Sequence, residues 1–480
     1  MSVRTPPRLL DLAGMHLLRD DDLAFSALEQ LPVELFPPLF TEAFNGRHTE
    51  ILKVMVQAWP FARLPLGGLI DLPHVGPLQA VLEALDVLFV QVCARRCKLQ
   101  VLDLWDTGHN FWSMWSGAST HRCTSSGRTP VAEPRSMTKQ HVAPLKVFID
   151  LSLKKRTLNN FLTYLLRWVE QRKASIHLCC KKLKIVSMPM DNIVKVVSMV
   201  QLDCIQEVQV SCTWNLSTLA TFAPFLGHMS NLQRFRLFPI QVSAFKKQEH
   251  DHVVQITSQF QRLGHLRDLH LESPSFLEEL ISWFLPRCLK TTLDNLSITN
   301  CQLTESDLTH LSRCPNICQL KSLELNGVTL MDFNPELLQV LLEEVAATLQ
   351  ELYLDQCGIQ DSQFEAILPS LSRCSQLRSF SLCGNILSMA VMEKLLRQTA
   401  GLSCLSQEWY PAPRENYSPQ GILLDGRLPQ LQTELLEILR DLGQPRTIWL
   451  TFSPCPHCGL PLCRYVCYGR ELHLVQLSQP

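Results

Sequence analysis

The chain has 480 residues, of which 46% are hydrophobic and 19% charged, and its formal net charge is −1 at pH 7. This balance excludes a general electrostatic attraction to nucleic acids or anionic membranes, so we expect partners that are proteins. The 19 cysteines are scattered through leucine-rich segments, and we see neither a secretory leader nor an apolar run of the roughly 18 residues that a transmembrane helix needs. We therefore expect reduced, mostly buried thiols in a cytoplasmic protein, with the nucleus as the alternative location.

Residues 1–98 lack any repeat and are typical of helices, as in the nearly continuous apolar face from Leu78 to Cys93. The end of a repeat array needs a cap, because a terminal repeat would otherwise expose its hydrophobic core. We therefore predict a helical N-terminal cap over residues 1–98. Residues 99–200 are interpreted as irregular early repeats, with a mobile loop near 117–142 where Ser, Gly, Thr and Pro accumulate.

The pattern L-x-x-L-x-L recurs in seven copies and is the strongest signal in the sequence. The first positions of successive copies lie 27, 34, 27, 27, 29 and 28 residues apart. Such a period is typical of leucine-rich repeats, in which each copy supplies one strand and one helix to a shared core. The copies begin at Ile205, Leu232, Leu266, Leu293, Leu320, Leu349 and Leu377.

Helix signals fill the intervals between these strands, as at Asn334 and Pro335, which are typical of a helix N-terminus. We therefore predict an α/β leucine-rich-repeat solenoid, a curved horseshoe with parallel strands on its concave side and helices on its convex side. The regular repeats cover 201–400, and residues 401–480 are expected to form a C-terminal cap with a helix from Leu428 to Leu442.

A cysteine or asparagine follows the strand at the same position of several repeats, as at Cys301, Cys357 and Asn385. Buried backbone N–H and C=O groups need hydrogen-bond partners, and these side chains are placed to supply them. We expect them to bond to the neighbouring turn and to tie successive repeats together.

The residues on either side of the second apolar position of each strand should point out of the concave face, because side chains alternate along a strand. They are polar and of mixed charge, with basic residues early and acidic residues later. We predict that they form a partner-binding surface, and the alternative is an ordinary solvated face. The positions are Glu207, Gln209, Arg234, Arg236, Asp268, His270, Asn295, Ser297, Ser322, Glu324, Glu351, Tyr353, Ser379 and Ser381.

Several segments that lie mostly outside the repeats are similar to one known family. They are LPVELFPPLF from Leu31, FNGRH from Phe44, MVQAWPF from Met55, GHNFW from Gly108, LCCKKL from Leu178 and CPHCG from Cys455. On these segments, which span nearly the whole chain, the sequence resembles the PRAME family (preferentially expressed antigen in melanoma).

The resemblance implies a leucine-rich-repeat fold and no catalysis. It also implies a substrate-recognition adaptor of a cullin-2 RING ubiquitin ligase, joined through elongin B and C, which promotes proteasomal degradation of a target. The alternative role is a transcriptional corepressor scaffold in retinoic acid receptor signalling, which restrains differentiation and apoptosis and promotes proliferation. The residues themselves carry no phosphate loop, no H-E-x-x-H, no G-x-S-x-G and no dinucleotide fingerprint, and we expect no cofactor.

Leu9, Ala13 and Leu17 are spaced four residues apart and would share one face of a helix. An elongin-binding box has this form, with a leucine for a pocket, a small residue one turn later and another apolar residue after that. We interpret the three residues as a candidate elongin box, although Arg8 stands where the usual box has Ser or Thr. The alternative is that they cover the first repeat.

The late cysteines Cys455, Cys458, Cys463 and Cys467 resemble a zinc site, because the first pair has C-x-x-C spacing. The second pair departs from that spacing, and the segment between the pairs is too short for an ordinary zinc ribbon. Buried reduced thiols are therefore the favoured interpretation, and we expect no metal.

Two segments match the L-x-x-L-L box that binds nuclear receptors, one from Leu162 to Leu166 and one from Leu338 to Leu342. Both lie on helices whose leucines the repeat already requires in its core. Core packing is therefore the favoured interpretation of both.

Overall fold

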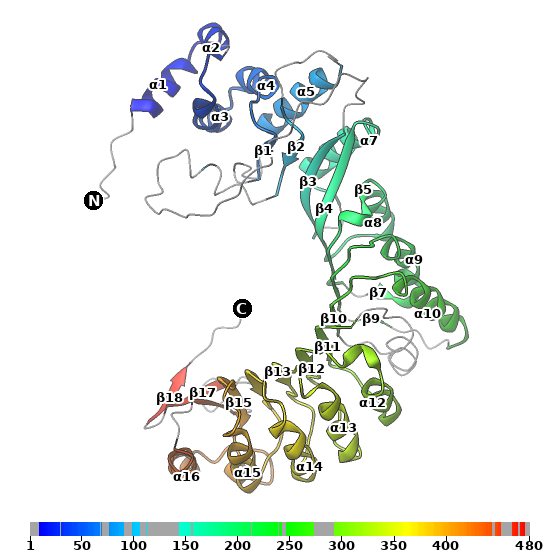
Figure 1. Cartoon of the computed structure of the whole chain (residues 1–480), viewed down its shortest axis with the longest axis vertical. Coiled ribbons are helices and arrows are strands. Elements are labelled where there is room, and N and C mark those ends of the chain that lie inside the picture. The colour runs from blue at the N-terminus through cyan, green and yellow to red at the C-terminus, as the bar shows by residue number, and fades with distance from the viewer. Residues whose placement is uncertain are drawn as a thin grey trace. The chain divides into compact units, whose positions relative to one another are not determined.

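The computed structural model describes residues 9–28, 30–67, 69, 76–90, 98–105, 112, 144–154, 157–212, 214–238, 240–241, 246–272, 292–443, 447–452, 463–468 and 471–475. The chain divides into two compact units. One comprises Met1–Leu183 with Ser187–Ile205, and the other comprises Lys184–Val186 with Gln206–Pro480. Both combine helices with parallel strands (Figure 1).

The first unit begins with a group of short helices. They are α1 (Leu9–Leu17), α2 (Asp21–Leu28), the 3-10 helix η1 (Val33–Leu35), α3 (Phe36–Asn45), α4 (Thr49–Gln57) and α5 (Gly76–Val90). Aromatic side chains form part of their core, where the fully buried rings of Phe40 and Trp59 lie 5.1 Å apart at an angle of 65°. Helices this short are marginal alone, so this packing stabilises them.

The strands of the first unit are β1 (Arg63–Pro65), β2 (Val101–Asp103), β3 (Leu145–Leu153), most of β4 (Ile176–Ile185) and β5 (Val200–Gln201). Helices α7 (Asn160–Glu170) and α8 (Met190–Val197) lie between these strands in sequence, and the 3-10 helix η2 (Leu202–Cys204) follows β5. Parallel pairing places Leu64 opposite Leu102 and Leu102 opposite Val147, and all three side chains are fully buried. The sequence did not predict β1, because three residues carry little local pattern and the strand depends on its pairing with distant β2.

Nine strands of the second unit lie side by side and parallel. In order they are β6 (Glu207–Val210), β8 (Arg234–Leu237), β10 (Asp268–Glu272), β11 (Asn295–Thr299), β12 (Ser322–Glu324), β13 (Glu351–Tyr353), β14 (Ser379–Ser381), β15 (Gln407–Pro411) and β16 (Ile448–Phe452). The antiparallel strands β17 (Cys463–Tyr468) and β18 (Glu471–Val475) continue this sheet. A separate pair is formed by β7 (Trp214–Asn215) and β9 (Ile240–Gln241).

The central apolar residues of the seven repeats are in register and buried, which confirms the predicted leucine-rich-repeat sheet. Each one pairs with its equivalent in the next strand. They are Val208, Phe235, Leu269, Leu296, Leu323, Leu352 and Phe380, none more than 1% exposed.

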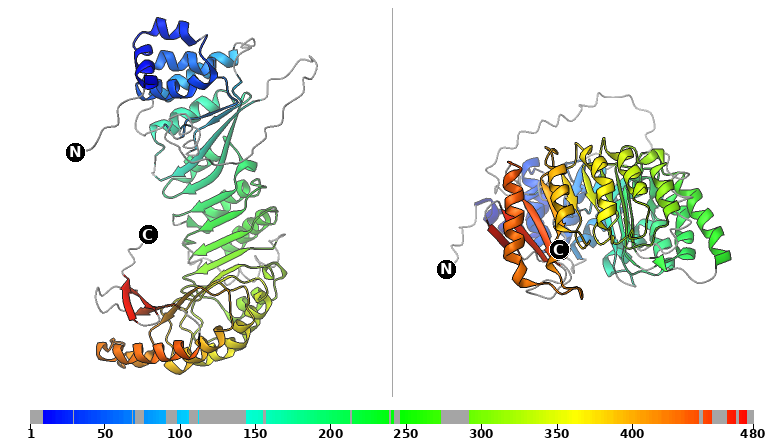
Figure 2. Two further views of the ribbon diagram at one scale, coloured as in Figure 1. Left: turned by 60° about the vertical axis from the view of Figure 1, so that its left-hand side comes forward. Right: turned by 90° about the horizontal axis from the view of Figure 1, so that it is seen from below.

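The helices of the second unit cover the sheet on its outer side, while the strands line the inner side of the arc that this unit forms (Figures 1 and 2). Asn334 accepts a hydrogen bond from the N–H of Glu336 at the start of α13, as its sequence position predicts. The helices are α9 (Leu216–Leu226), α10 (Lys246–Phe260), α12 (Glu305–Ser312), α13 (Pro335–Val345), α14 (Asp361–Ser372), α15 (Met389–Thr399) and α16 (Leu428–Asp441), with 3-10 helices η3 (Pro315–Ile317), η4 (Arg414–Asn416) and η5 (Asp425–Arg427).

The turn residues bond to neighbouring repeats as predicted. The thiol of Cys357 donates to the carbonyl of Leu325 at 2.9 Å, and the amide of Asn385 donates to the carbonyl of Leu354 at 2.7 Å. All eleven cysteines whose side chains are described are free, and seven of these are buried. Among the described helices, none is both long enough and apolar enough to span a membrane.

Candidate protein-binding surface on the inner strands

The predicted surface residues form two rows on the inner side of the second unit. The parallel register aligns each side chain with its equivalent on the next strand, about 4.8 Å away. One row contains Glu207, Arg234, Asp268, Asn295, Ser322, Glu351 and Ser379, and the other contains Gln209, Arg236, His270, Ser297, Glu324, Tyr353 and Ser381.

The last two members of these rows are not part of the open surface. Ser379 is 6% exposed and Ser381 is 3% exposed, which corrects the expectation that both face a partner. The hydroxyl of Ser379 bonds to Gln407, and that of Ser381 bonds to Asp355 at 2.5 Å. The longer side chains to which these two serines bond cover them from solvent. The exposed part of the rows therefore ends at β13.

The basic end of the surface lies on β8 and holds two arginines in different electrostatic settings. The Nε atom of Arg234 lies between two carboxylates, 3.7 Å from Glu207 and 3.8 Å from Asp268. Arg236 is exposed, and no ion pair involves it within the described part of the chain. The charge of Arg234 is therefore largely balanced within the protein, whereas that of Arg236 faces solvent.

The acidic end lies on β12 and β13. Glu324 accepts hydrogen bonds of 2.7 Å from Ser297 and Asn326, and Glu351 accepts one of 3.1 Å from Ser322. These donors are neutral, and among the described residues no cation forms an ion pair with either carboxylate. These hydrogen bonds position the two glutamate side chains without neutralising them, so their negative charges are available to a partner.

His270 lies between the two ends. Burial lowers the pKa of its imidazole from the ordinary value, and its ring lies 5.6 Å from that of Phe238. At neutral pH the side chain is therefore uncharged and separates the basic end from the acidic end.

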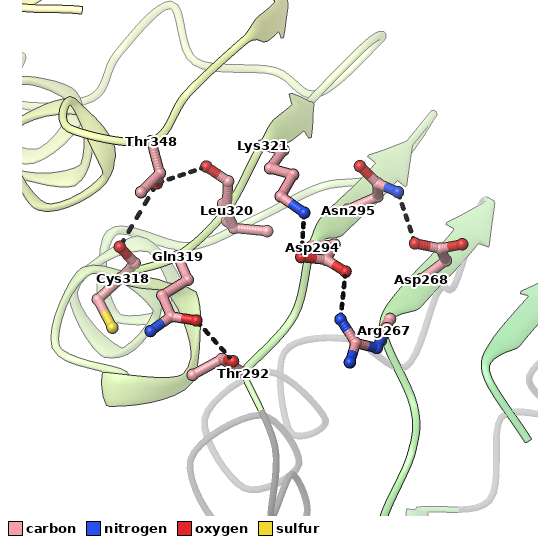
Figure 3. A network of polar contacts seen from close by, with 10 residues as sticks. All are labelled: Arg267, Asp268, Thr292, Asp294, Asn295, Cys318, Gln319, Leu320, Lys321 and Thr348. Atoms are coloured by element: carbon pink, nitrogen blue, oxygen red, sulfur yellow. Dashed lines mark hydrogen bonds and ion pairs between the residues drawn. The ribbon is translucent and has the colours of Figure 1, made fainter. Parts of the chain in front are cut away.

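A third row, directly before the strands, was missed by the sequence analysis. Asp294 lies between Arg267 at 3.1 Å and Lys321 at 3.0 Å, as Figure 3 shows. Burial opposes the ionisation of Asp294, but hydrogen bonds from Lys321 and Arg267 hold the pKa of its carboxyl below the usual value. These residues share the second position of L-x-x-L-x-L, so the repeat itself could have revealed their alternating charges.

A hollow of about 550 Å³ follows the rows from Arg234 on β8 to Glu351 on β13. Its lining includes Lys321 from the third row and is mostly polar. The arrangement offers hydrogen-bonding groups of both charges to a macromolecule that lies across the strands.

The candidate elongin box lies on α1 in the first unit. Leu9 is 86% exposed, Ala13 is exposed and Leu17 is half-buried. Ala13 and Leu17 line a small apolar hollow together with Leu31 and Leu35. The helix therefore presents Leu9 to solvent next to an apolar depression.

The comparisons with known proteins decide the family. Residues 6–112 match the PRAME N-terminal domain, and residues 145–467 match the PRAME C-terminal domain. The chain belongs to the PRAME family. Three human relatives are PRAME family members 8, 12 and 10, which are 52%, 52% and 43% identical to it. Each alignment covers 96% of this chain, and 97%, 95% and 97% of the respective relative.

Among solved structures, a leucine-rich-repeat protein of Leptospira interrogans matches 60% of this chain and 88% of its own, with 13% identity and a TM-score of 0.22. The polar rows described above suit the binding of a macromolecular partner.

In this PRAME-family chain, the leucines of both L-x-x-L-L segments lie in the hydrophobic core, as predicted from the sequence. Leu162, Leu165 and Leu166 are at most 7% exposed on α7. On α13, Leu338 is 5% exposed, and Leu341 and Leu342 are fully buried. These leucines are not available to a receptor in the folded protein.

The candidate zinc ligands fall largely outside the described residues. Cys455 and Cys458 lie outside them, while Cys463 and Cys467 lie on β17 with side chains that are not described. Elsewhere in the described ranges, no group of three His, Cys, Asp or Glu side chains could hold a metal ion.

Proposed function

We propose that this protein is the substrate-recognition adaptor of a cullin-2 RING ubiquitin ligase. In this role α1 binds elongin B and C, and the inner strand surface captures a target protein for proteasomal degradation. The observation that carries the proposal is the open polar hollow from Arg234 to Glu351 on a parallel sheet. A scaffold with in-register side chains of both charges can select one protein partner from many.

The apolar surface of α1 supports the ligase half of the proposal. Leu9 is 86% exposed, and Leu12 and Met15 are 45% and 38% exposed on the same short helix. Exposed apolar side chains gathered on one element are typical of an interaction site. A partner that buried Leu9 would remove its side chain from water.

The corepressor alternative has less support from the residues. Its most direct sequence feature was the receptor box, and both copies are buried in helices of the core. Direct receptor contact through either box would require local unfolding of α7 or α13.

The proposal is tested by affinity purification of the full chain from a reducing cell extract. We expect elongin B, elongin C and cullin-2 to co-purify. We expect Leu9→Glu and Ala13→Arg each to reduce their recovery at least about tenfold, a change of roughly 1.4 kcal/mol in binding free energy.

The matched control is Ile422→Glu, which places the same charge on an apolar side chain that is 64% exposed in the second unit. This variant should retain the elongins. The proposal fails if Leu9→Glu and Ala13→Arg retain them as well, or if no elongin co-purifies with the unaltered chain.

A further inference from the structure

We propose that the hollow on β8–β13 binds an extended segment of the target protein that carries an acidic residue and, about four to six residues away, a basic residue. This inference rests on the proposed function, because it describes the chemistry of the target that the adaptor would recognise.

The acidic residue of the segment would bind at Arg236. The charge of Arg234, two residues earlier on β8, is already largely balanced, because carboxylate oxygens of Glu207 and Asp268 lie within 4 Å of it. Arg236 is exposed and lines the hollow without an ion pair among the described residues. Its guanidinium group can donate two parallel hydrogen bonds to a carboxylate.

The basic residue would bind at Glu324 or Glu351. The hydroxyls of Ser297 and Ser322 donate to these carboxylates and hold them in position without neutralising them. Carboxylates oriented in this way are ready to accept a hydrogen bond from an arginine or lysine of a partner. Lys321 lies nearby but bonds to Asp294 instead.

The separation of the two ends sets the spacing in the segment. β8, β10, β11, β12 and β13 are consecutive neighbours in the sheet. Neighbouring strands are about 4.8 Å apart. Glu324 on β12 is three strands away from β8, which carries Arg236, so the two are about 14 Å apart. Glu351 on β13 is four strands away from β8, or about 19 Å. An extended chain advances about 3.3 Å per residue, so these distances correspond to about four and about six residues.

The middle of the hollow favours an uncharged stretch between the two charged residues. Asn295, Ser297 and Ser322 line it with neutral hydrogen-bonding groups. Asp268 and Lys321 also line it, but their charges are paired with Arg234 and Asp294. A charged side chain placed over the neutral groups would lose hydration without gaining a partner of opposite charge.

The test uses twelve-residue fluorescent peptides of Ser, Ala and Gly that contain one Glu and one Arg separated by between about zero and about eight residues. Their binding to the full chain is measured by fluorescence polarisation. We expect affinity to peak when the Arg follows or precedes the Glu by four to six positions, at least about threefold above the shortest spacing. We also expect the peak to flatten at high salt.

An altered-charge variant makes the test specific. Arg236→Glu makes both ends of the hollow acidic. We therefore expect this variant to lose affinity for the Glu/Arg peptides and to gain affinity for peptides with two arginines at the same spacing. The matched control Arg313→Glu makes the same change at an exposed residue that caps α12 on the helical side. It should keep the original preference.

A series that shows no dependence on spacing, or a preference that Arg236→Glu leaves unchanged, overturns the inference. Elongin co-purification is a separate readout, since it depends on α1. If peptide affinity does not depend on spacing but elongins still co-purify, only the proposed target segment is rejected. If affinity peaks at the expected spacing but no elongin co-purifies, the target segment is supported and the ligase role is rejected.

Discussion

The side-chain oxygen of Asn385 accepts a hydrogen bond of 3.1 Å from the backbone N–H of Cys357, one repeat earlier. The same oxygen accepts a second bond from the N–H of Ile359 at 3.2 Å, and the amide nitrogen donates to the carbonyls of Leu354 and Leu382. Asn385 is 4% exposed, so water has little access to these groups. One side chain therefore satisfies four buried backbone groups across two repeats.

We predict that Asn385→Ala lowers the free energy of unfolding by about 2–4 kcal/mol, because it leaves buried backbone groups without partners. Urea unfolding followed by circular dichroism measures this change. The neighbouring Ile386 is 67% exposed, and Ile386→Ala should alter stability by less than about 0.5 kcal/mol. Equal unfolding midpoints for the two variants would show that the asparagine does not couple the repeats.

The parts of the fold that the sequence predicted are those that depend on a repeated local pattern. Leu323 and Leu352 pair in register because each repeat carries the same strand pattern, and its helix and turns return the chain to the next strand. The two polar rows follow directly from this register and from the alternation of side chains along a strand.

The parts that the sequence did not predict depend on contacts between distant residues. β15 continues the parallel sheet beyond residue 400, but its inward positions include Glu408, which is 1% exposed and accepts a hydrogen bond from the Tyr410 hydroxyl at 2.6 Å. A buried glutamate breaks the apolar pattern by which strands are recognised. The burial of Ser379 has the same origin, since its partner Gln407 lies on this strand.

The two arginines of β8 should respond differently to charge reversal. Arg234→Glu would place three carboxylates close together, because Glu207 and Asp268 already flank the site. We expect it to lower the free energy of unfolding by up to about 1 kcal/mol. Arg236→Glu should change stability by less than about 0.5 kcal/mol, since this residue balances no carboxylate in the described structure.

Both variants should weaken capture of the target in pull-downs from cell extract. Thermal unfolding of each purified variant separates loss of binding from loss of structure, and Arg313→Glu is the control for a change of net charge alone. Unchanged capture by a folded Arg236→Glu variant would mean that the inner surface is an ordinary solvated face.

The buried thiols should be unreactive in the folded protein. Burial raises the pKa of Cys357 from its ordinary value to about 12, so its nucleophilic thiolate form is rare near neutral pH. Cys318 and Cys404 are exposed. We predict that iodoacetamide labels these two cysteines quickly at about pH 8 and labels Cys357 only in denaturant, as peptide mass spectrometry would show. Equal labelling of Cys357 and Cys318 in native protein would contradict its burial.

The same pKa shift makes stability depend on alkaline pH. In the unfolded chain the pKa of the Cys357 thiol is near its ordinary value of 9.0, whereas burial raises this pKa to about 12 in the folded protein. The folded state therefore binds more protons in this window, and the free energy of unfolding falls as pH rises above about 9. Cys180 and Cys301 add the same effect, since burial also raises their pKa to about 12.

We expect Cys357→Ala to lose less stability than the unaltered chain between about pH 8 and about pH 10, measured as the shift of its urea midpoint. Cys404→Ala, at an exposed cysteine, should keep the full pH dependence. The comparison rests on slopes and not on absolute stabilities, so the cavity that Cys357→Ala leaves in the core does not affect it. Identical slopes for both variants would mean that the Cys357 thiol ionises equally easily in the folded and unfolded chains.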